Sequence, residues 1–237
     1  MSRLKKIIAK KMYSILPLPY VLMFHHIIDA PAIPRSACTL DFQKFKDFVL
    51  EFKGCYTTMI DIAQNKRKGK IAITFDDGLE DLYTVAYKFL KENEIPFTAF
   101  IVTDFLDTEG YITTEQLREM SADPLVTIGS HGVSHKVFPK MTSLEKKIEL
   151  EESQRKLQEI IGKDVKIFAY SHGQYDDETL SIMGCYDYAV AAGASLSMYF
   201  TWNKHLIPRY NIETDTYIRQ LEFFKNAALD RTDRKNY

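Results

Sequence analysis

The stretch Ile71-Ala72-Ile73-Thr74-Phe75-Asp76-Asp77-Gly78 is an apolar run that ends in two adjacent carboxylates and a glycine. Its first five residues are typical of a strand buried on both faces. Asp77-Gly78 by itself is a common hairpin-turn signal. No returning strand follows, because residues 80–93 have a helical pattern that Pro96 closes. The stretch therefore predicts a strand leading into a helix, and either a plain turn or a functional pair of carboxylates at the end of that strand.

The same alternation of strand and helix runs along the rest of the chain. Short apolar runs predict seven strands: Tyr20–Phe24, Ile71–Phe75, Phe97–Val102, Val126–Gly129, Val165–Tyr170, Tyr188–Ala192 and Leu206–Ile212. Helix-start signals lie between them: Thr39 before an apolar stripe, Thr113 with Gln116, and Thr142 with Glu145 opening a helix over 143–161. We expect one α/β domain over residues 1–237, built from parallel βαβ units. Periodicity does not choose between an open doubly wound sheet and a closed barrel.

Composition and charge exclude several classes of protein. The chain has 237 residues, is 46% hydrophobic and 27% charged, and so is long and apolar enough to fold around a core. Its 31 basic and 32 acidic residues leave a formal net charge of −1, which gives no field that favours nucleic acid. The three cysteines form no CxxC pair, which indicates reduced thiols.

The N-terminal segment, residues 1–18, needs separate treatment because it combines lysines with apolar residues. Lys10 and Lys11 interrupt the apolar run and Pro17 breaks it, so the segment matches neither an export signal nor a membrane span. Residues 3–15 predict a short basic amphipathic helix, which either packs on the domain or rests on a membrane surface. We therefore expect a cytoplasmic location, with peripheral membrane contact as an open alternative.

A second polar constellation follows the strand predicted at Val126–Gly129. His131 and His135 are spaced i and i+4, which on a helical turn places both imidazoles on one face. They are either two surface or capping histidines or two ligands of a metal ion. Two histidines and one carboxylate leave coordination positions open, as in a hydrolytic metal centre. Dinucleotide and P-loop motifs are absent from the sequence, and Gly193–Ser197 is an incomplete nucleophile elbow.

Together these motifs resemble those of the polysaccharide deacetylases, carbohydrate esterase family 4. Residues 74–78 (TFDDG) resemble the first motif and residues 130–135 (SHGVSH) the second. Residues 168–175 (FAYSHGQY) resemble the third, and residues 21–25 (VLMFH) resemble the N-terminal motif of the branch that contains poly-N-acetylglucosamine deacetylases. The resemblance spans roughly residues 20–212 and implies a distorted, incomplete (β/α) barrel of about seven parallel strands.

The resemblance also implies roles for individual residues. Asp77, His131 and His135 would hold a divalent metal, with Zn²⁺ expected and Co²⁺ or Ni²⁺ as alternatives. Asp76 would be the general base that takes a proton from the attacking water. His25 would be the general acid that protonates the departing amine. The register of the motif favours His25 over the adjacent His26, which is the alternative.

The third motif departs from the family pattern. Ala169 and Ser171-His172 stand where the family usually has an arginine that orients the base and a proline-tyrosine pair. Arg209 is the candidate to replace that arginine beside Asp76; the alternative is that it forms a surface ion pair. The backbone N–H of His172 is a candidate donor to the oxyanion, because a main-chain group does not depend on the side chain.

Further residues are expected to bind substrate. By similarity of the third motif these are Tyr170, His172 and Gly173. Trp202 is a candidate wall of the sugar pocket, because aromatic faces stack on pyranose rings, although core packing is an equally ordinary role for it.

The predicted function is a metal-dependent carbohydrate N-deacetylase, a hydrolase of carbon–nitrogen bonds other than peptide bonds. Its expected partner is a carbohydrate substrate that carries N-acetyl groups, in a glycan or a glycan precursor. One alternative is a carbohydrate-binding protein with a degenerate deacetylase site, as the altered third motif suggests. Another is an O-acetyl esterase on the same scaffold. The sequence identifies neither the sugar nor the oligomeric state.

Overall fold

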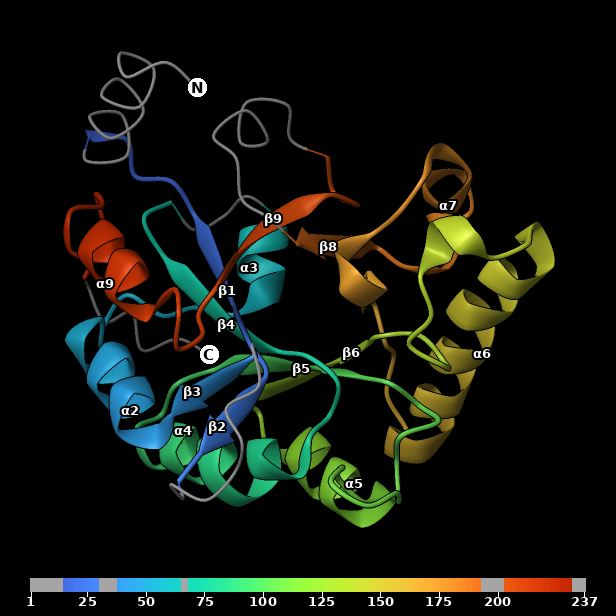
Figure 1. Cartoon of the computed structure of the whole chain (residues 1–237), viewed down its shortest axis with the longest axis horizontal. Helices are drawn as coiled ribbons and strands as arrows, with labels where there is room; N and C mark the ends of the chain where they lie inside the picture. The colour runs from blue at the N-terminus through green and yellow to red at the C-terminus, as the bar shows by residue number, and fades with distance from the viewer. Residues whose placement is uncertain (1–14, 30–37, 65–67, 193–202, 232–237) are drawn as a thin grey trace.

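The computed structural model describes residues 15–29, 38–64, 68–192 and 203–231 (Figure 1). Seven parallel strands form a closed barrel in the order β1-β4-β5-β6-β7-β8-β9. Their bounds are β1 Tyr20–Phe24, β4 Ile71–Phe75, β5 Phe97–Ile101, β6 Val126–Ser130, β7 Ile167–Ala169, β8 Tyr188–Ala192 and β9 Ile207–Asn211. The ring closes because β1 pairs with β9 as well as with β4. The predicted α/β class and the seven-stranded (β/α) barrel are confirmed, and the open sheet is excluded.

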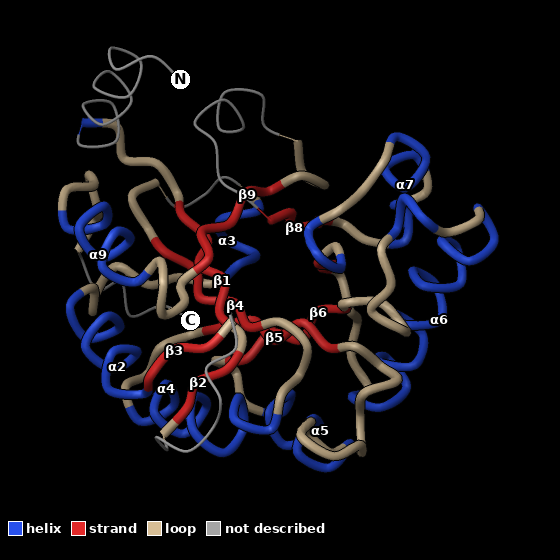
Figure 2. The backbone as a smooth tube through the Cα atoms, viewed as in Figure 1, coloured by secondary structure: helices blue, strands red, loops and turns tan. Residues whose placement is uncertain are grey.

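Alternation along the strands separates an inner from an outer layer. On β4, Ile71, Ile73 and Phe75 belong to the large outer cluster, whereas Ala72 belongs to a smaller inner one. The outer cluster packs against the helices that surround the strands (Figure 2). The inner cluster is formed by strand residues of the opposite parity: Val21, Ala72, Phe100, Ile167, Ala169, Val190 and Ile207. Because side chains alternate, Thr74 and Asp76 share the inward face with Ala72.

One end of the barrel is closed by α3, which spans Met59–Ala63. Its buried residues Met59, Ile62 and Ala63 join the inner cluster. Four residues of that cluster stand at the first or second position of their strands: Val21, Ala72, Ile167 and Ile207. This places α3 toward the amino-terminal end of the barrel. Polar groups are left to gather at the carboxyl-terminal end, where the expected site residues lie.

The remaining helices lie mostly between successive strands. They are α2 Phe42–Glu51, the π-helix η1 Leu82–Tyr87 with α4 Lys88–Glu92, α5 Thr114–Ala122, α6 Ser143–Ile161, α7 Asp177–Ser181 and α9 Tyr217–Lys225, with short 3₁₀ turns η2 Phe138–Lys140, η3 Ser171–Gly173 and η4 Met183–Cys185. Both predicted capping boxes, Thr113 with Gln116 and Thr142 with Glu145, are present. Each satisfies backbone donors that the first helical turn would otherwise leave unpaired.

A small parallel sheet of β2 (His26–Ile28) and β3 (Thr39–Asp41) was not predicted. It also corrects the expected start of the second helix, because Thr39 lies in β3 and does not cap α2. The side chain of Asp41 is the cap instead and accepts a hydrogen bond from the Lys44 N–H. Strands of three residues are too short to give a periodic signal.

Some expectations fall on residues outside the described ranges. They are the helix over 3–15 except its last residue, the segment 193–197 and Trp202. No helix in the described part of the chain is long and apolar enough to cross a membrane.

Candidate functional site

The loop after β4 directs two neighbouring carboxylates to different partners. Asp77 and Gly78 both adopt left-handed backbone conformations, with φ of 72° and 76°. Such a conformation disfavours most side chains, and at Gly78 a Cβ would also lie 3.2 Å from Ile101 Cδ1. The turn that the sequence suggested is therefore real, but it leads into a helix and separates the side chains of Asp76 and Asp77.

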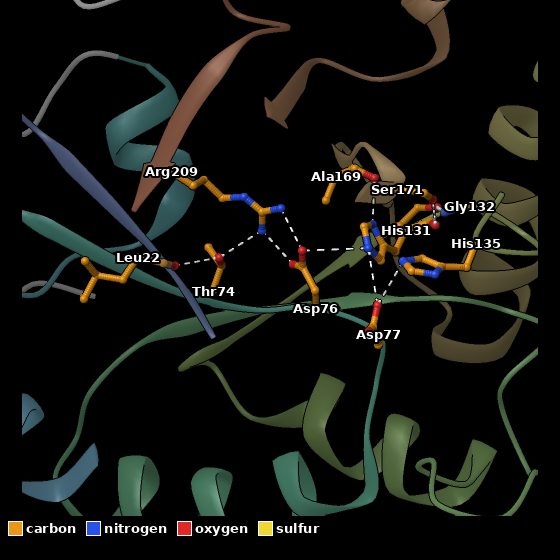
Figure 3. Close-up of polar contacts among 11 residues, drawn as sticks. Leu22, Thr74, Asp76, Asp77, His131, Gly132, His135, Ala169, Ser171 and Arg209 are labelled. Carbon is orange, nitrogen blue, oxygen red and sulfur yellow. Dashed lines mark hydrogen bonds and ion pairs between the residues drawn. The ribbon is translucent and has the colours of Figure 1, made fainter. Parts of the chain in front are cut away.

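Asp76 is paired with Arg209 inside the barrel (Figure 3). The Arg209 guanidinium donates to Asp76 Oδ1 at 2.6 Å and to Oδ2 at 2.7 Å. It also donates at 3.2 Å to Thr74 Oγ1, which in turn donates to the Leu22 carbonyl at 2.7 Å. Only 1% of the Arg209 side chain and 3% of the Asp76 side chain are exposed, so the surface ion pair considered for Arg209 is wrong. Arg209 lies within β9, and its contact fixes the plane of the carboxylate.

The charge state of Asp76 follows from this pairing. Burial raises the pKa of the carboxyl, but the nearby Arg209 and then His131 outweigh it and hold the pKa well below its ordinary value. Asp76 is therefore ionised at neutral pH and available as a proton acceptor.

Asp77 lies between two histidines from the loop after β6 (Figure 3). Its Oδ1 is 3.4 Å from His131 Nε2 and 3.2 Å from His135 Nε2. Ligands bound to a tetrahedral zinc ion at about 2.0–2.1 Å lie about 3.3 Å apart, which matches both separations. Asp77 Oδ1 is buried and finds no hydrogen-bond partner among the described residues. The three groups therefore fit a divalent cation.

The ring of His131 is oriented by the third-motif segment. Its Nδ1 lies 2.8 Å from the Ala169 carbonyl oxygen, which can only accept a hydrogen bond. Nδ1 therefore carries the proton and Nε2 faces Asp77, which is the arrangement that a metal ligand needs. This contact uses the backbone, so the alanine at this position of the motif does not disturb it.

The two histidines differ in their affinity for protons. Burial, with the charge of His131 second, lowers the pKa of His135 to about 4, so its imidazole is neutral at neutral pH. Burial also acts to lower the pKa of His131, but the carboxylates of Asp76 and Asp77 together raise it above its ordinary value. A cation bound here has to displace a proton from His131, so metal binding is expected to weaken in acid.

The i, i+4 spacing brings the two imidazoles together without the helical turn that was expected. Residues 131–135 form an irregular loop in which Gly132 and His135 have positive φ values of 87° and 59°. The imidazole centroids nevertheless lie 4.8 Å apart. The predicted proximity is present, but the backbone achieves it by two left-handed residues.

His25 and His26 point to different surroundings. His25 directly follows β1 and, by alternation, shares the inward side with Val21. Its Nδ1 is buried and finds no hydrogen-bond partner in the described part of the chain. His26 Nδ1 instead lies 2.6 Å from Asp81 Oδ2, at the start of η1. His25, and not His26, is thus the histidine whose Nδ1 is not already engaged by a described side chain.

The His26–Asp81 pair gives a pH-dependent contribution to stability. The hydrogen bond that the His26 ring donates to the Asp81 carboxylate raises the pKa of His26 above its ordinary value of 6.5, although burial opposes this. The folded protein holds this proton more tightly, so the contribution is full below about pH 6.5 and is lost as the pH rises through the raised pKa. Because the His26 side chain is 37% exposed, we expect only about 0.2–1 kcal/mol.

Replacing Asp81 with asparagine should therefore lower the free energy of unfolding at about pH 6 and change it little at about pH 8.5. Urea denaturation at the two pH values measures the difference. Asp164→Asn, at a side chain that is 78% exposed, is the matched control and should show no such dependence. Equal destabilisation by Asp81→Asn at both pH values would contradict the assignment.

The third-motif residues are divided between the site and the core. The exposed His172 has its ring centroid 4.5 Å from that of His135, and Gly173 beside it is half-buried with a φ of 65°. Tyr170 is fully buried, lies in the outer layer with Phe168, and donates its hydroxyl hydrogen bond to the His205 carbonyl. The expectation that Tyr170 contacts substrate is therefore corrected, because its side chain points away from the barrel interior.

An aromatic pair beside the candidate metal ligands was missed at the level of sequence. Phe105 and Tyr111, on the loop after β5, have ring centroids 4.6 Å apart, and Phe105 lies 6.0 Å from His135. Both are half-buried. The only sequence signal was their place in a loop after a strand's carboxyl end, where site residues of such folds gather.

Comparison with known proteins gives a family for this arrangement. The sequence model of the family described as polysaccharide deacetylase matches residues 63–191. YxkH of Bacillus subtilis, whose name places it among the polysaccharide deacetylases, is 30% identical over 121 residues, which are 50% of this chain and 43% of that protein. A poly-beta-1,6-N-acetyl-D-glucosamine N-deacetylase of Staphylococcus aureus is 27% identical over 148 residues, 54% of this chain and 50% of that protein. The chain thus spans about half the length of these relatives.

Solved structures share the fold over most of the chain. A polysaccharide deacetylase from Bacillus cereus is 25% identical with a TM-score of 0.74, covering 88% of this chain and 69% of that one. IcaB from Ammonifex degensii has a TM-score of 0.74 at 20% identity, covering 88% of this chain and 97% of that one. The latter likeness shows the fold alone.

Proposed function

Because this chain belongs to the polysaccharide deacetylase family, we propose that it is a metal-dependent hydrolase that removes acetyl groups from N-acetylated sugars of a glycan or glycan precursor. The observation that carries the proposal is that the two neighbouring carboxylates, Asp76 and Asp77, have different partners. Asp77 lies between two histidine nitrogens, whereas Asp76 is held by Arg209 and faces only the His131 Nε2, at 3.7 Å. One carboxylate is thus placed to bind a cation and the other to take a proton.

The binding-only alternative rested on the arginine that the third motif lacks. The bidentate contact of Arg209 with Asp76 supports an intact site instead. An arginine from β9 would then do the work that another member of the family takes from the third motif.

In the proposed reaction, water adds to the amide carbon and the carbon–nitrogen bond breaks. When bound by Asp77, His131 and His135, a divalent cation, Zn²⁺ in our proposal with Co²⁺ or Ni²⁺ as alternatives, supplies Lewis acidity toward water and the acetyl carbonyl. Asp76 accepts the proton that the attacking water loses, while Arg209 keeps its carboxylate ionised and oriented.

Two further groups act on the substrate in this proposal. The imidazole of His25 donates a proton to the departing sugar nitrogen, so that it leaves as an amine. The backbone N–H of His172 donates a hydrogen bond to the developing oxyanion. Phe105 and Tyr111 offer flat apolar faces to a sugar ring next to His135, and His172 and Gly173 border the same side of the site.

The two adjacent histidines give a direct test of the proton donor. His25→Ala is expected to lower acetate release about 10²-fold with little change in zinc affinity, because the leaving nitrogen loses its proton source. His26→Ala should cost less than about 10-fold, because His26 is engaged by Asp81 outside the barrel interior. A larger loss in His26→Ala would reverse the assignment.

The function itself is tested by acetate release from N-acetylglucosamine oligomers, from lipid-linked and nucleotide-linked N-acetyl sugars, and from O-acetylated sugars. The assay is run on the protein as purified, after chelation, and after zinc is added back. Chelator-sensitive release restored by zinc supports the proposal, and the preferred arm shows whether polymer or precursor is the substrate. A folded, zinc-loaded protein that releases acetate from O-acetylated sugars alone would favour the esterase, and one that binds the oligomers without turnover would favour the binding protein.

A further inference from the structure

Glu149 on α6 is a buried acid that the proposed reaction does not use. It is 6% exposed, and its Oε2 accepts hydrogen bonds from the Val133 N–H at 2.7 Å and the Ser134 N–H at 3.0 Å. Its other carboxylate oxygen accepts from the Ser134 hydroxyl. All of these donors belong to the irregular loop that carries His131 and His135 at its two ends.

The carbonyl groups of the loop are held from the segment after β5, where the Thr103 N–H donates to the Gly132 carbonyl at 3.1 Å and the Asp104 N–H to the Val133 carbonyl at 3.0 Å, whereas the N–H groups of Val133 and Ser134 are bound by Glu149. The loop lies outside regular secondary structure, and Gly132 and His135 have left-handed backbone conformations. It packs so closely on α6 that a Cβ added to Gly132 would lie 2.7 Å from Glu149 Oε2. For the N–H groups of Val133 and Ser134, the carboxylate therefore replaces the backbone carbonyls that a helix or strand would supply.

The two ends of the loop are fixed differently. His131 is held independently of Glu149, by its N–H bond to the Ile101 carbonyl at 2.8 Å and by its ring bond to the Ala169 carbonyl. Gly132 donates to Ser130 Oγ at 3.2 Å, which is itself anchored on Ser153 of α6. Toward the end that carries His135, Glu149 binds the N–H groups of Val133 and Ser134, and the only other backbone hydrogen bond of these two residues in the described part of the chain is that of the Asp104 N–H to the Val133 carbonyl.

Among the described residues, the Glu149 carboxylate contacts these loop donors and no basic side chain. Burying a carboxylate is costly unless its oxygens are well paired. No ion pair to Glu149 is found among residues 15–29, 38–64, 68–192 and 203–231. Lys146, one turn earlier on α6, contacts Asp176 and Glu178 instead. Leu150 and Leu157, also buried on α6, show the apolar residues that packing alone would select.

We infer that Glu149 is a positioning residue of the metal centre, which holds His135 in place by binding the backbone of the loop. This rests on the proposed metal site and adds a residue to it that no motif contains. Partners that orient a metal ligand are worth about 10–100-fold in metal affinity. The expected loss is partial, because Asp77 lies on another loop and His131 keeps its hydrogen bonds to the Ile101 and Ala169 carbonyls.

Zinc affinity of the full chain, measured by competition with a chromogenic chelator, tests the inference without substrate. Glu149→Ala is expected to bind zinc about 10–100-fold more weakly. Glu149→Gln keeps an oxygen for both N–H groups and should stay within about 5-fold of wild type. Glu149→Asp keeps the charge but is one methylene shorter, so it should lose more affinity than Glu149→Gln. Glu151→Gln, at an exposed position of α6, is the matched control.

Thermal melting of the metal-free variants separates positioning from mere stability. A lower melting temperature with wild-type zinc affinity in Glu149→Ala would overturn the inference, as would equal losses in Glu149→Gln and Glu149→Ala. If Glu149→Ala does not fold, the ranking of Glu149→Asp below Glu149→Gln decides. Faster hydrogen exchange of the Val133 and Ser134 amides in the weaker variant is the expected companion result.

Failure of the inference and failure of the proposed function give different results. Wild-type protein that binds zinc but releases no acetate would refute the deacetylase and leave the role of Glu149 standing. Acetate release by wild type, together with unchanged zinc affinity in the Glu149 variants, would support the deacetylase and refute the role of Glu149. A wild-type chain that binds no zinc would overturn both.

Discussion

Asp76→Asn is expected to lower acetate release about 10³–10⁴-fold, the largest loss of turnover among the variants that keep the metal site. An asparagine fills the same space and still offers Arg209 one acceptor oxygen, but it cannot take a proton. Zinc affinity should stay near wild type, because Asp77 and not Asp76 lies between the two histidines.

Two controls make this result specific. Asp164→Asn changes an exposed carboxylate in the same way and should leave turnover unchanged. Urea denaturation checks that Asp76→Asn is folded, because the change leaves the buried charge of Arg209 partly unpaired. Turnover within about 10-fold of wild type in a folded, zinc-loaded Asp76→Asn protein would refute the proposed base.

Arg209→Met should have the largest effect on stability. Methionine fills a similar volume without a charge, and the change leaves the Asp76 carboxylate buried without its partner. Breaking a buried ion pair in this way costs about 3–5 kcal/mol of unfolding free energy. Turnover should also fall, because the two hydrogen bonds from Arg209 that fix the plane of the Asp76 carboxylate are lost.

A double-mutant cycle distinguishes loss of the pair from loss of packing. Combining Arg209→Met with Asp76→Asn removes both buried charges, so the double variant should be more stable than Arg209→Met alone. Strictly additive losses would show that the pair contributes little. Arg155→Met, at an exposed arginine of α6, should change stability by less than about 0.5 kcal/mol.

Much of the fold could be predicted because its signals are local. All seven barrel strands are short apolar runs between turn or helix-start residues, and the capping boxes at Thr113 and Thr142 are set by residues three positions apart. The two polar motifs could be placed at strand ends for the same reason. The strands β2 and β3 escaped because three residues are too few for a period to appear.

Only part of the candidate site could be predicted from the sequence. The motifs named Asp76, Asp77, His131 and His135, but Arg209 was ambiguous, because its partner lies 133 positions away in the sequence. Tyr170 was misplaced, since a motif does not tell on which side of a strand a side chain points. Glu149 was missed because its proposed function is to accept hydrogen bonds from backbone N–H groups. Nearly every residue has such a group, so no residue type in the sequence marks the partners of Glu149.

The sequence by itself therefore determined the seven barrel strands, the two helix starts with capping boxes and the residue types that carry the proposed chemistry, all of which depend on neighbours along the chain. Only the tertiary structure decided that β9 closes the barrel against β1, that Arg209 faces Asp76, and that α6 supports the histidine loop. The physical reason is that these contacts arise from strand order and strand parity. Strand order and strand parity are both set when distant segments pack together, and neither can be deduced from one segment alone.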